Sequence, residues 1–105
     1  MRDFVDLRGA SGTLYRFRLW PEGGAHPPIA GNYILLREEA SGLKVLLAGI
    51  TSDLSQAAAE CRKTLVKEPA ARLYTRLNVA RALRTTEHED IVAEHRPAVM
   101  STGEK

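Results

Sequence analysis

Two stretches of the chain carry the residue types that could do chemistry, and the first lies near the N-terminus. Arg16 and Arg18 alternate with apolar residues just before Trp20, so all three side chains are expected on one face of a strand. A strand face of arginine and aromatic side chains can hold a nucleic-acid strand by stacking and charge. The same pattern fits an amphipathic outer face on which arginine stems cover apolar surface. The sequence leaves both interpretations open.

The second stretch lies in a helical pattern near the C-terminus, where cationic side chains recur at three-, four- and seven-residue spacings. These spacings put them near one side of a helix, at Arg81, Arg84, His88 and His95. The stripe could face a bound anion, or it could be a solvated face balanced by the nearby acids Glu87, Asp90 and Glu94. No metal site is expected, because His88 and His95 are roughly 10 Å apart along the helix axis.

Composition and charge narrow the class of protein. The chain has 105 residues, 44% of them hydrophobic, and a net charge of +2, which is typical of one globular domain with no bulk attraction for nucleic acid. Cys61 is the only cysteine, so an internal disulfide and a cysteine-based zinc site are not expected. No apolar run is long enough for a bilayer and no signal-peptide pattern is visible, so we expect the cytoplasm and no membrane partner.

Alternating apolar and polar residues predict that the elements holding the first stretch are two strands. Residues 3–8 and 13–20 form the strands of a β-hairpin, and the glycine-rich segment 9–12 forms its turn. Residues 21–30 contain several prolines, which cannot donate to a strand ladder, and we expect an irregular connection there.

Two apolar runs predict a second hairpin, with strands at residues 31–36 and 45–51 and a turn at residues 39–42. A helix should follow directly, since Asp53 and Gln56 have the spacing of a capping box. Its apolar stripe comprises Leu54, Ala57, Ala58, Cys61 and Leu65, in which the thiol is expected to be buried and unreactive.

The second stretch should lie on a final helix. Residues 72–77 alternate and fit either a strand or the start of a longer helix. Asn78 is a good N-cap for a helix that runs to about His95, and the predicted apolar side of this helix comprises Val79, Ala82, Leu83 and Ile91. Arg81 and Arg84 would lie off that side. We expect one domain over residues 1–97 and a flexible C-terminal tail at residues 98–105.

The second hairpin and the helix start resemble a known family. The segments Gly31-Asn32-Tyr33 and Leu47-Ala48-Gly49-Ile50-Thr51, followed by Asp53-Leu54, resemble the GIY-YIG nuclease superfamily over roughly residues 3–97. The resemblance implies an α+β fold in which the N-terminal hairpin precedes a β-β-α-β-α core, with a small antiparallel or mixed sheet flanked by helices. It also favours the strand for residues 72–77.

In that family a strand tyrosine activates water, an arginine of the first helix stabilises phosphate, and a glutamate of the last helix holds a divalent metal. Carried over to this chain, the first tyrosine is Tyr33, but Leu47 stands in place of the second. Gln56 or Ala57 stands in place of the arginine, His88 in place of the glutamate, and Met100 in place of a closing asparagine. The resemblance therefore implies a largely dismantled nuclease site.

We expect a non-catalytic, GIY-YIG-like domain that binds a protein partner or a nucleic acid and needs no cofactor. The candidate binding residues are Arg16, Arg18, Trp20, Arg81, Arg84 and His88. We favour a protein, because the arginines are dispersed. The alternative is a divergent endonuclease that uses Tyr33 and a Mg²⁺ ion held by Glu87 or Glu89. A third class is a purely structural or regulatory module whose cleft has no ligand.

Overall fold

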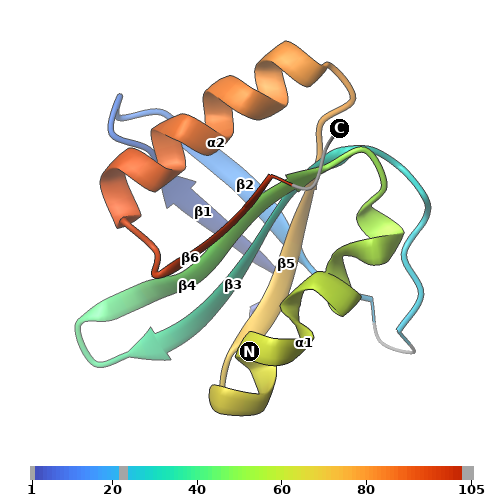
Figure 1. Ribbon diagram of the computed structural model, residues 1–105. Helices are drawn as coiled ribbons and strands as arrows, with labels where there is room; N and C mark the ends of the chain where they lie inside the picture. Colours follow the sequence, from blue (N-terminus) through green and yellow to red (C-terminus); the bar gives the residue numbers. More distant parts are fainter. Residues whose placement is uncertain (1, 22–23, 103–105) are drawn as a thin grey trace.

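The computed structural model describes residues 2–21 and 24–102, which form a curled six-stranded sheet with two helices (Figure 1). Its elements are β1 (Phe4–Arg8), β2 (Leu14–Leu19), β3 (Gly31–Glu39), β4 (Gly42–Thr51), a 3₁₀ turn (Leu54–Gln56), α1 (Ala57–Lys67), β5 (Arg72–Leu77), α2 (Arg81–His95) and β6 (Val99–Thr102). The strand order is β1-β2-β5-β3-β4-β6. All neighbouring strands run antiparallel except β4 and β6, which run parallel. The fold class is α+β.

The strands β1 and β2 alternate between buried and exposed residues, as half-buried strands do. Val5 and Leu7 of β1 and Tyr15 and Phe17 of β2 point into the core, and the residues between them are exposed. The two strands join through the turn that the sequence predicts, where the Gly9 N–H donates to the carbonyl oxygen of Thr13 at 2.9 Å. One face of this hairpin therefore belongs to the core and the other is open.

The strands β3 and β4 lie in the interior of the sheet and are buried on both faces along residues 31–36 and 45–50. Their pairing is the antiparallel one that the sequence predicts, from Gly31 with Thr51 to Glu39 with Gly42. A bulge interrupts it, because Leu35 pairs with Leu47 whereas Leu36 pairs with Val45. The extra residue on β4 puts both Leu46 and Leu47 in the core on the α1 side.

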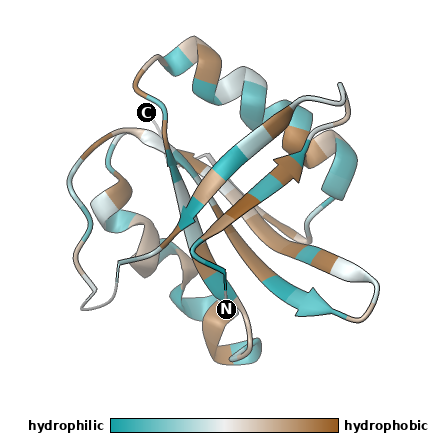
Figure 2. Ribbon diagram, turned by 180° about the vertical axis from the view of Figure 1, so that it is seen from behind, coloured by the Kyte–Doolittle hydropathy of each residue, from teal (hydrophilic) through white to brown (hydrophobic). Residues whose placement is uncertain are grey.

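Each helix covers one face of the sheet, and the two cores are separate. The sheet curls around α2, whose Ile91 packs with Phe17, Ile34 and Tyr74. On the opposite face, α1 packs its Ala57 and Cys61 against Leu35 and Leu73, among others. The principal strand contacts of α1 are with β4 and β5, so the corresponding face of β1 and β2 extends beyond it. Figure 2 shows hydrophobic and hydrophilic residues alternating along the N-terminal strands β1 and β2, of which only one face is buried.

The start of the first helix follows the prediction in part. The Asp53 side chain accepts from the backbone N–H of Ser55 at 3.0 Å, so it caps the 3₁₀ turn that leads into α1. Gln56 makes no capping bond. The N–H of Asp53 instead donates to the Thr51 hydroxyl at 3.0 Å, and this replaces the second half of a capping box.

The predicted flexible tail is wrong for residues 99–102. They form β6, which pairs with β4 from Leu47 with Val99 to Ile50 with Thr102. Without this strand, the backbone N–H and C=O groups along one side of the buried β4 would lack partners, and β6 supplies them. Residues 103–105 of the predicted tail, like Met1 of the predicted domain, lie outside the described residues.

Candidate functional site

Tyr33, the retained tyrosine, is a core residue on the α1 face. It is almost completely buried, and its ring stands over Gly49, where an added Cβ would lie 2.3 Å from the Tyr33 Cζ atom. Burial raises the pKa of Tyr33 to about 12, and a hydrogen bond with the Ser101 side chain acts in the opposite direction. The phenol is therefore protonated at neutral pH. Its surroundings explain why position 49 needs a glycine.

The remaining positions of the expected nuclease site on this face hold apolar or uncharged side chains, which cannot supply a cation to a phosphate. Leu47 and Ala57 are fully buried in the same cluster as Tyr33, while Gln56 is exposed. Burial raises the pKa of the neighbouring Cys61 thiol to about 12, and the charge of Glu60 adds to the effect. A thiol with such a pKa is a packing group rather than a nucleophile, as the sequence predicts.

The two glutamates of the alternative nuclease site lie on α2, across the sheet from Tyr33. Glu87 accepts hydrogen bonds from Arg76 Nε at 2.8 Å and from Asn78 Nδ2 at 3.0 Å, and Glu89 is exposed. Successive residues of β3 point to opposite faces, so Tyr33 turns toward α1 while Asn32 bonds to α2. The structure thus does not bring Tyr33 together with either glutamate. Among the described residues, no three acidic, histidine or cysteine side chains are grouped to hold a metal ion.

The solvated-face interpretation of the cationic stripe on the last helix is wrong for two of its members. Arg84 and His88 are buried and face the core together with Ile91, while Arg81 is exposed. Burial lowers the pKa of His88, and the charge of Glu89 opposes this shift. His95 lies apart from His88 and contacts the carbonyl oxygen of Arg8 through Nε2 at 2.8 Å.

The predicted apolar side of this helix is right for Ile91, which is buried, and wrong for Val79, Ala82 and Leu83, which are exposed. Val79 precedes the helix and is 73% exposed, and Leu83 is 56% exposed. Leu83 and Ile91 are eight residues apart, which is a rotation of about 80° on a helix, so they need not share a buried face. Asn78 is not the N-cap, since Ala80 holds that position without a side-chain bond.

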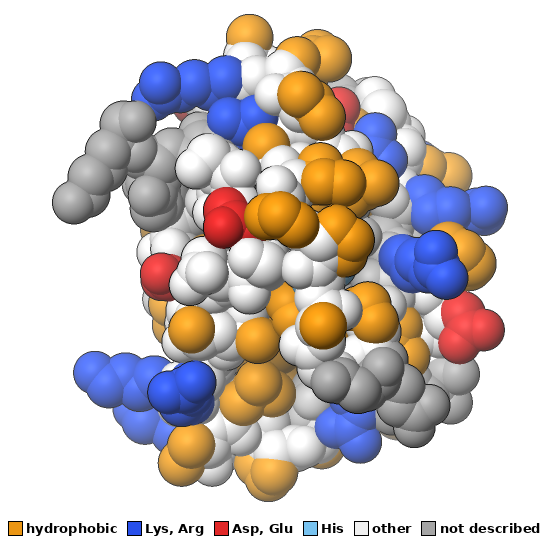
Figure 3. Space-filling model, turned by 90° about the vertical axis from the view of Figure 1, so that its right-hand side faces the viewer, with side chains coloured by type: hydrophobic (Ala, Val, Ile, Leu, Met, Phe, Trp, Pro, Cys, Tyr) orange, Lys and Arg blue, Asp and Glu red, His pale blue; other side chains and the backbone are white. Residues whose placement is uncertain are grey.

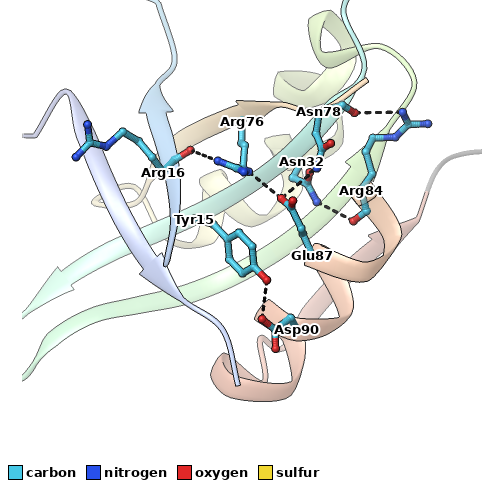
Figure 4. Close-up of polar contacts among 8 residues, drawn as sticks. All are labelled: Tyr15, Arg16, Asn32, Arg76, Asn78, Arg84, Glu87 and Asp90. Atoms are coloured by element: carbon cyan, nitrogen blue, oxygen red, sulfur yellow. Dashed lines mark hydrogen bonds and ion pairs between the residues drawn. The ribbon is translucent and has the colours of Figure 1, made fainter. Parts of the chain in front are cut away.

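A buried polar network explains how charged residues can face this core (Figure 4). Arg84 Nη1 donates to the carbonyl oxygens of Asn78 at 3.2 Å and Val79 at 2.6 Å. Asn32 Nδ2 donates to the carbonyl oxygen of Arg84 at 3.0 Å, and Asn78 Nδ2 donates to Asn32 Oδ1 at 3.0 Å. These bonds join β3, the β5–α2 connection and α2. The only sequence signal for this network is Asn32, a polar residue inside an apolar strand.

A second polar cluster fastens the N-terminal hairpin to α2. The Asp90 carboxylate accepts from the Ser11 N–H at 2.8 Å, the Ser11 hydroxyl at 2.6 Å and the Tyr15 hydroxyl at 2.7 Å. These bonds from Ser11 and then from Tyr15 hold the pKa of Asp90 below its ordinary value. Arg76 adds a further link, because it donates to Glu87 and to the carbonyl oxygen of Arg16.

The first predicted stretch lies at two adjoining hollows on the part of the sheet that α1 leaves open. One has a volume of about 500 Å³ and is lined by Arg16, Arg18, His26, Thr75, Arg76 and Leu77, among others. The other has a volume of about 1040 Å³ and extends past Trp20 to α1. We call the two together the open groove, since Phe4, Arg18, Leu19 and Pro21 line both.

Aromatic and cationic groups meet in the open groove. The guanidinium carbons of Arg16 and Arg18 lie 5.6 and 5.8 Å from the centroid of the half-exposed Phe4 ring. The rings of Trp20 and His26 have centroids 5.2 Å apart. Figure 3 shows hydrophobic side chains gathered on the side of the molecule that carries the connection between β2 and β3, with Lys and Arg side chains beside them. The sequence did not single out Phe4 or His26.

Comparisons with protein-family models, with curated proteins and with solved structures find no match. Of the helices in the described part of the chain, neither has the length and apolar character needed to cross a membrane.

Proposed function

We propose that this protein is a non-catalytic binding module, a degenerate GIY-YIG-like domain that binds a protein or a nucleic acid in the open groove. The observation that carries the proposal is the exposed sheet face of β1 and β2, where Arg16 and Arg18 flank Phe4 in a hollow beside Trp20. Such combinations of cationic and aromatic side chains are typical of binding surfaces.

The family assignment within this proposal has one specific support. The resemblance rests on a Gly-x-Tyr strand and a second strand that contains Gly49, and the ring of Tyr33 packs directly over that glycine. The order of two strands, a helix, a strand and a helix along the chain supports the proposal as well. The sixth strand, β6, is not part of that expectation.

The loss of nuclease activity follows from the separation of the groups that would have to cooperate. A metal ion held by Glu87 would lie across the sheet from Tyr33, and Glu87 is already bonded to Arg76 and Asn78. Missing metal and phosphate contacts remove several kcal/mol of transition-state stabilisation, and each ~1.4 kcal/mol is a factor of ten in rate. We expect no cleavage of single-stranded, duplex or branched DNA with Mg²⁺ or Mn²⁺. Cleavage that disappears in Tyr33→Phe would replace the proposal with the divergent nuclease.

The binding proposal is tested with the full chain against two probes, a displayed library of random peptides and fluorescent single-stranded oligonucleotides. We expect one of them to bind, and binding to be lost in Phe4→Ser and in Arg18→Glu, since both side chains line the open groove. Lys44→Glu is the matched control, because Lys44 is exposed and does not line the groove. If neither probe shows binding that depends on the groove, the proposal fails.

A further inference from the structure

We infer that the ligand of the open groove is an extended acidic peptide segment of a partner protein, with one carboxylate at Arg18 and apolar side chains on either side of it. This inference rests on the proposed function and specifies its ligand. It is drawn from the shape of the groove, from how its cations are already used, and from the apolar character of its walls.

The shape favours an extended chain. The two hollows share Phe4, Arg18, Leu19 and Pro21, so they are continuous, and these four residues line the middle of the groove. One end of the groove lies beside Thr75 and Leu77 of β5, and the other reaches Leu65 on α1. A peptide in extended conformation rises about 3.3 Å per residue and presents alternate side chains to such a surface.

The positive charges that line the groove favour a ligand with one carboxylate rather than several. Arg16 Nε is paired with Asp6 at 2.9 Å, and Arg76 Nε with Glu87 at 2.8 Å. Arg72 donates to the carbonyl oxygens of Pro69 and Ala71. Arg18 lies over the Phe4 ring, and no ion pair among the described residues involves it. The guanidinium of Arg18 is thus the group best suited to a ligand carboxylate, which it can hold in a bidentate contact.

The scarcity of acidic residues in the groove also favours a ligand carboxylate at Arg18. The hollow beside Thr75 has no acidic residue among its lining residues, and the hollow beside α1 has Asp3 alone. An anion placed at Arg18 therefore meets one carboxylate at most within the lining. The complementary ligand carries a small negative charge at its centre.

The walls favour a peptide over a polynucleotide. A nucleic-acid strand gains its affinity from several phosphate contacts at once, and two of the arginines that line the groove, Arg16 and Arg76, are already paired with carboxylates. Most of the remaining lining is apolar, including Leu19, Trp20, Ile29, Leu65 and Leu73. Apolar side chains of a peptide would bury this surface, whereas a charged backbone would not.

The inference is tested by displaying random nine-residue peptides and selecting them on the full chain. We expect enrichment of peptides in which an Asp or Glu is flanked by Leu, Phe or Trp. In a synthetic peptide of the enriched sequence, Glu→Gln should weaken binding about tenfold, since the contact at Arg18 is charge-assisted. Arg18→Glu should lose that peptide and instead bind its Glu→Lys version. Arg18→Gln, which keeps a polar side chain of similar length, and Lys44→Glu show whether an effect comes from charge at this site.

The outcomes separate this inference from the proposed function. Enriched peptides that lack an acid, or acidic peptides whose binding ignores Arg18→Glu, overturn the inference. An oligo-dT probe that binds in a groove-dependent way, with affinity falling steeply with salt, overturns the peptide and leaves the binding module standing. If neither probe binds through the groove, both fail. Circular dichroism and the thermal midpoint of each variant confirm that the fold is retained.

Discussion

The two faces of the sheet bind their helices through different interactions. Beneath α1 the packing is apolar, and Tyr33, Leu47 and Cys61 are buried in a cluster of hydrophobic side chains. Beneath α2, buried Asn32 and Arg84 contribute a network of hydrogen bonds. Most positions at which the family resemblance would put chemistry lie in this apolar core, while polar residues of the other face bond to one another. Polar residues such as Tyr33 and Glu87 therefore have structural roles here, and the side chains accessible to a ligand lie in the open groove.

The largest effect is expected from a cavity on the α1 face, which tests whether this face is held by apolar packing. Leu47→Ala removes a fully buried side chain from a packed apolar cluster, so we expect the free energy of unfolding to fall by about 2–5 kcal/mol. Urea unfolding followed by circular dichroism measures the change. Val66→Ala is the control, because Val66 is 78% exposed and its loss should cost little. A loss for Leu47→Ala as small as that of the control would contradict a packed α1 face.

A smaller effect is expected when the network under α2 is cut. Asn32→Ala removes the donor to the Arg84 carbonyl oxygen and the acceptor of the Asn78 amide, both in a buried setting. We expect a loss of about 1–3 kcal/mol in the free energy of unfolding. A double-mutant cycle of Asn32→Ala with Asn78→Ala should give a coupling of at least about 0.5 kcal/mol, since the two side chains bond directly. Strict additivity would show that the network is not cooperative.

The smallest effect is a dependence of stability on pH. Burial lowers the pKa of His88 in the folded protein below its ordinary value of 6.5, so the unfolded chain binds the proton first. Stability should therefore be full above pH 6.5 and decline as the pH falls through and below that value. His88→Gln should flatten the decline, and its change in stability at pH 8, where His88 is neutral in both states, gives the packing effect alone. A decline of equal steepness in the variant would assign it to other groups.

Much of the fold was predictable because its signals are local. Alternation in residues 13–20, the apolar runs of the second hairpin and the capping Asp53 each act within a few residues, and the structure has strands and a helix at these places. The strand β6 was missed because its four residues carry no periodic signal. Its partner β4 lies about fifty residues earlier in the chain, and only that pairing makes residues 99–102 a strand.

The face of α2 was missed for a different reason. Helical periodicity offers Leu83 as a core residue, whereas the structure buries Arg84 one position later. An arginine is acceptable there because its donors reach the carbonyl oxygens of Asn78 and Val79, which the sequence pattern does not reveal. For the open groove, the sequence predicted only the strand face that carries Arg16, Arg18 and Trp20. Arg16 and Arg18 are exposed as expected, but Trp20 is half-buried against the α1 core rather than standing free.

The join between β2 and β5 has a consequence for how the molecule moves. The register pairs of these strands are Arg18 with Thr75 and Leu19 with Tyr74, whereas β3 and β5 match along the whole of β5. The N-terminal hairpin is otherwise held by its buried Val5, Leu7 and Phe17, and by the hydrogen bonds of Tyr15 to Asp90 and of Arg76 to the Arg16 carbonyl oxygen. Because the backbone ladder between β2 and β5 is short, we expect the amide protons of the hairpin to exchange with solvent before those of β3, which is paired on both sides. A ligand in the open groove would touch both sides of this join and slow that exchange.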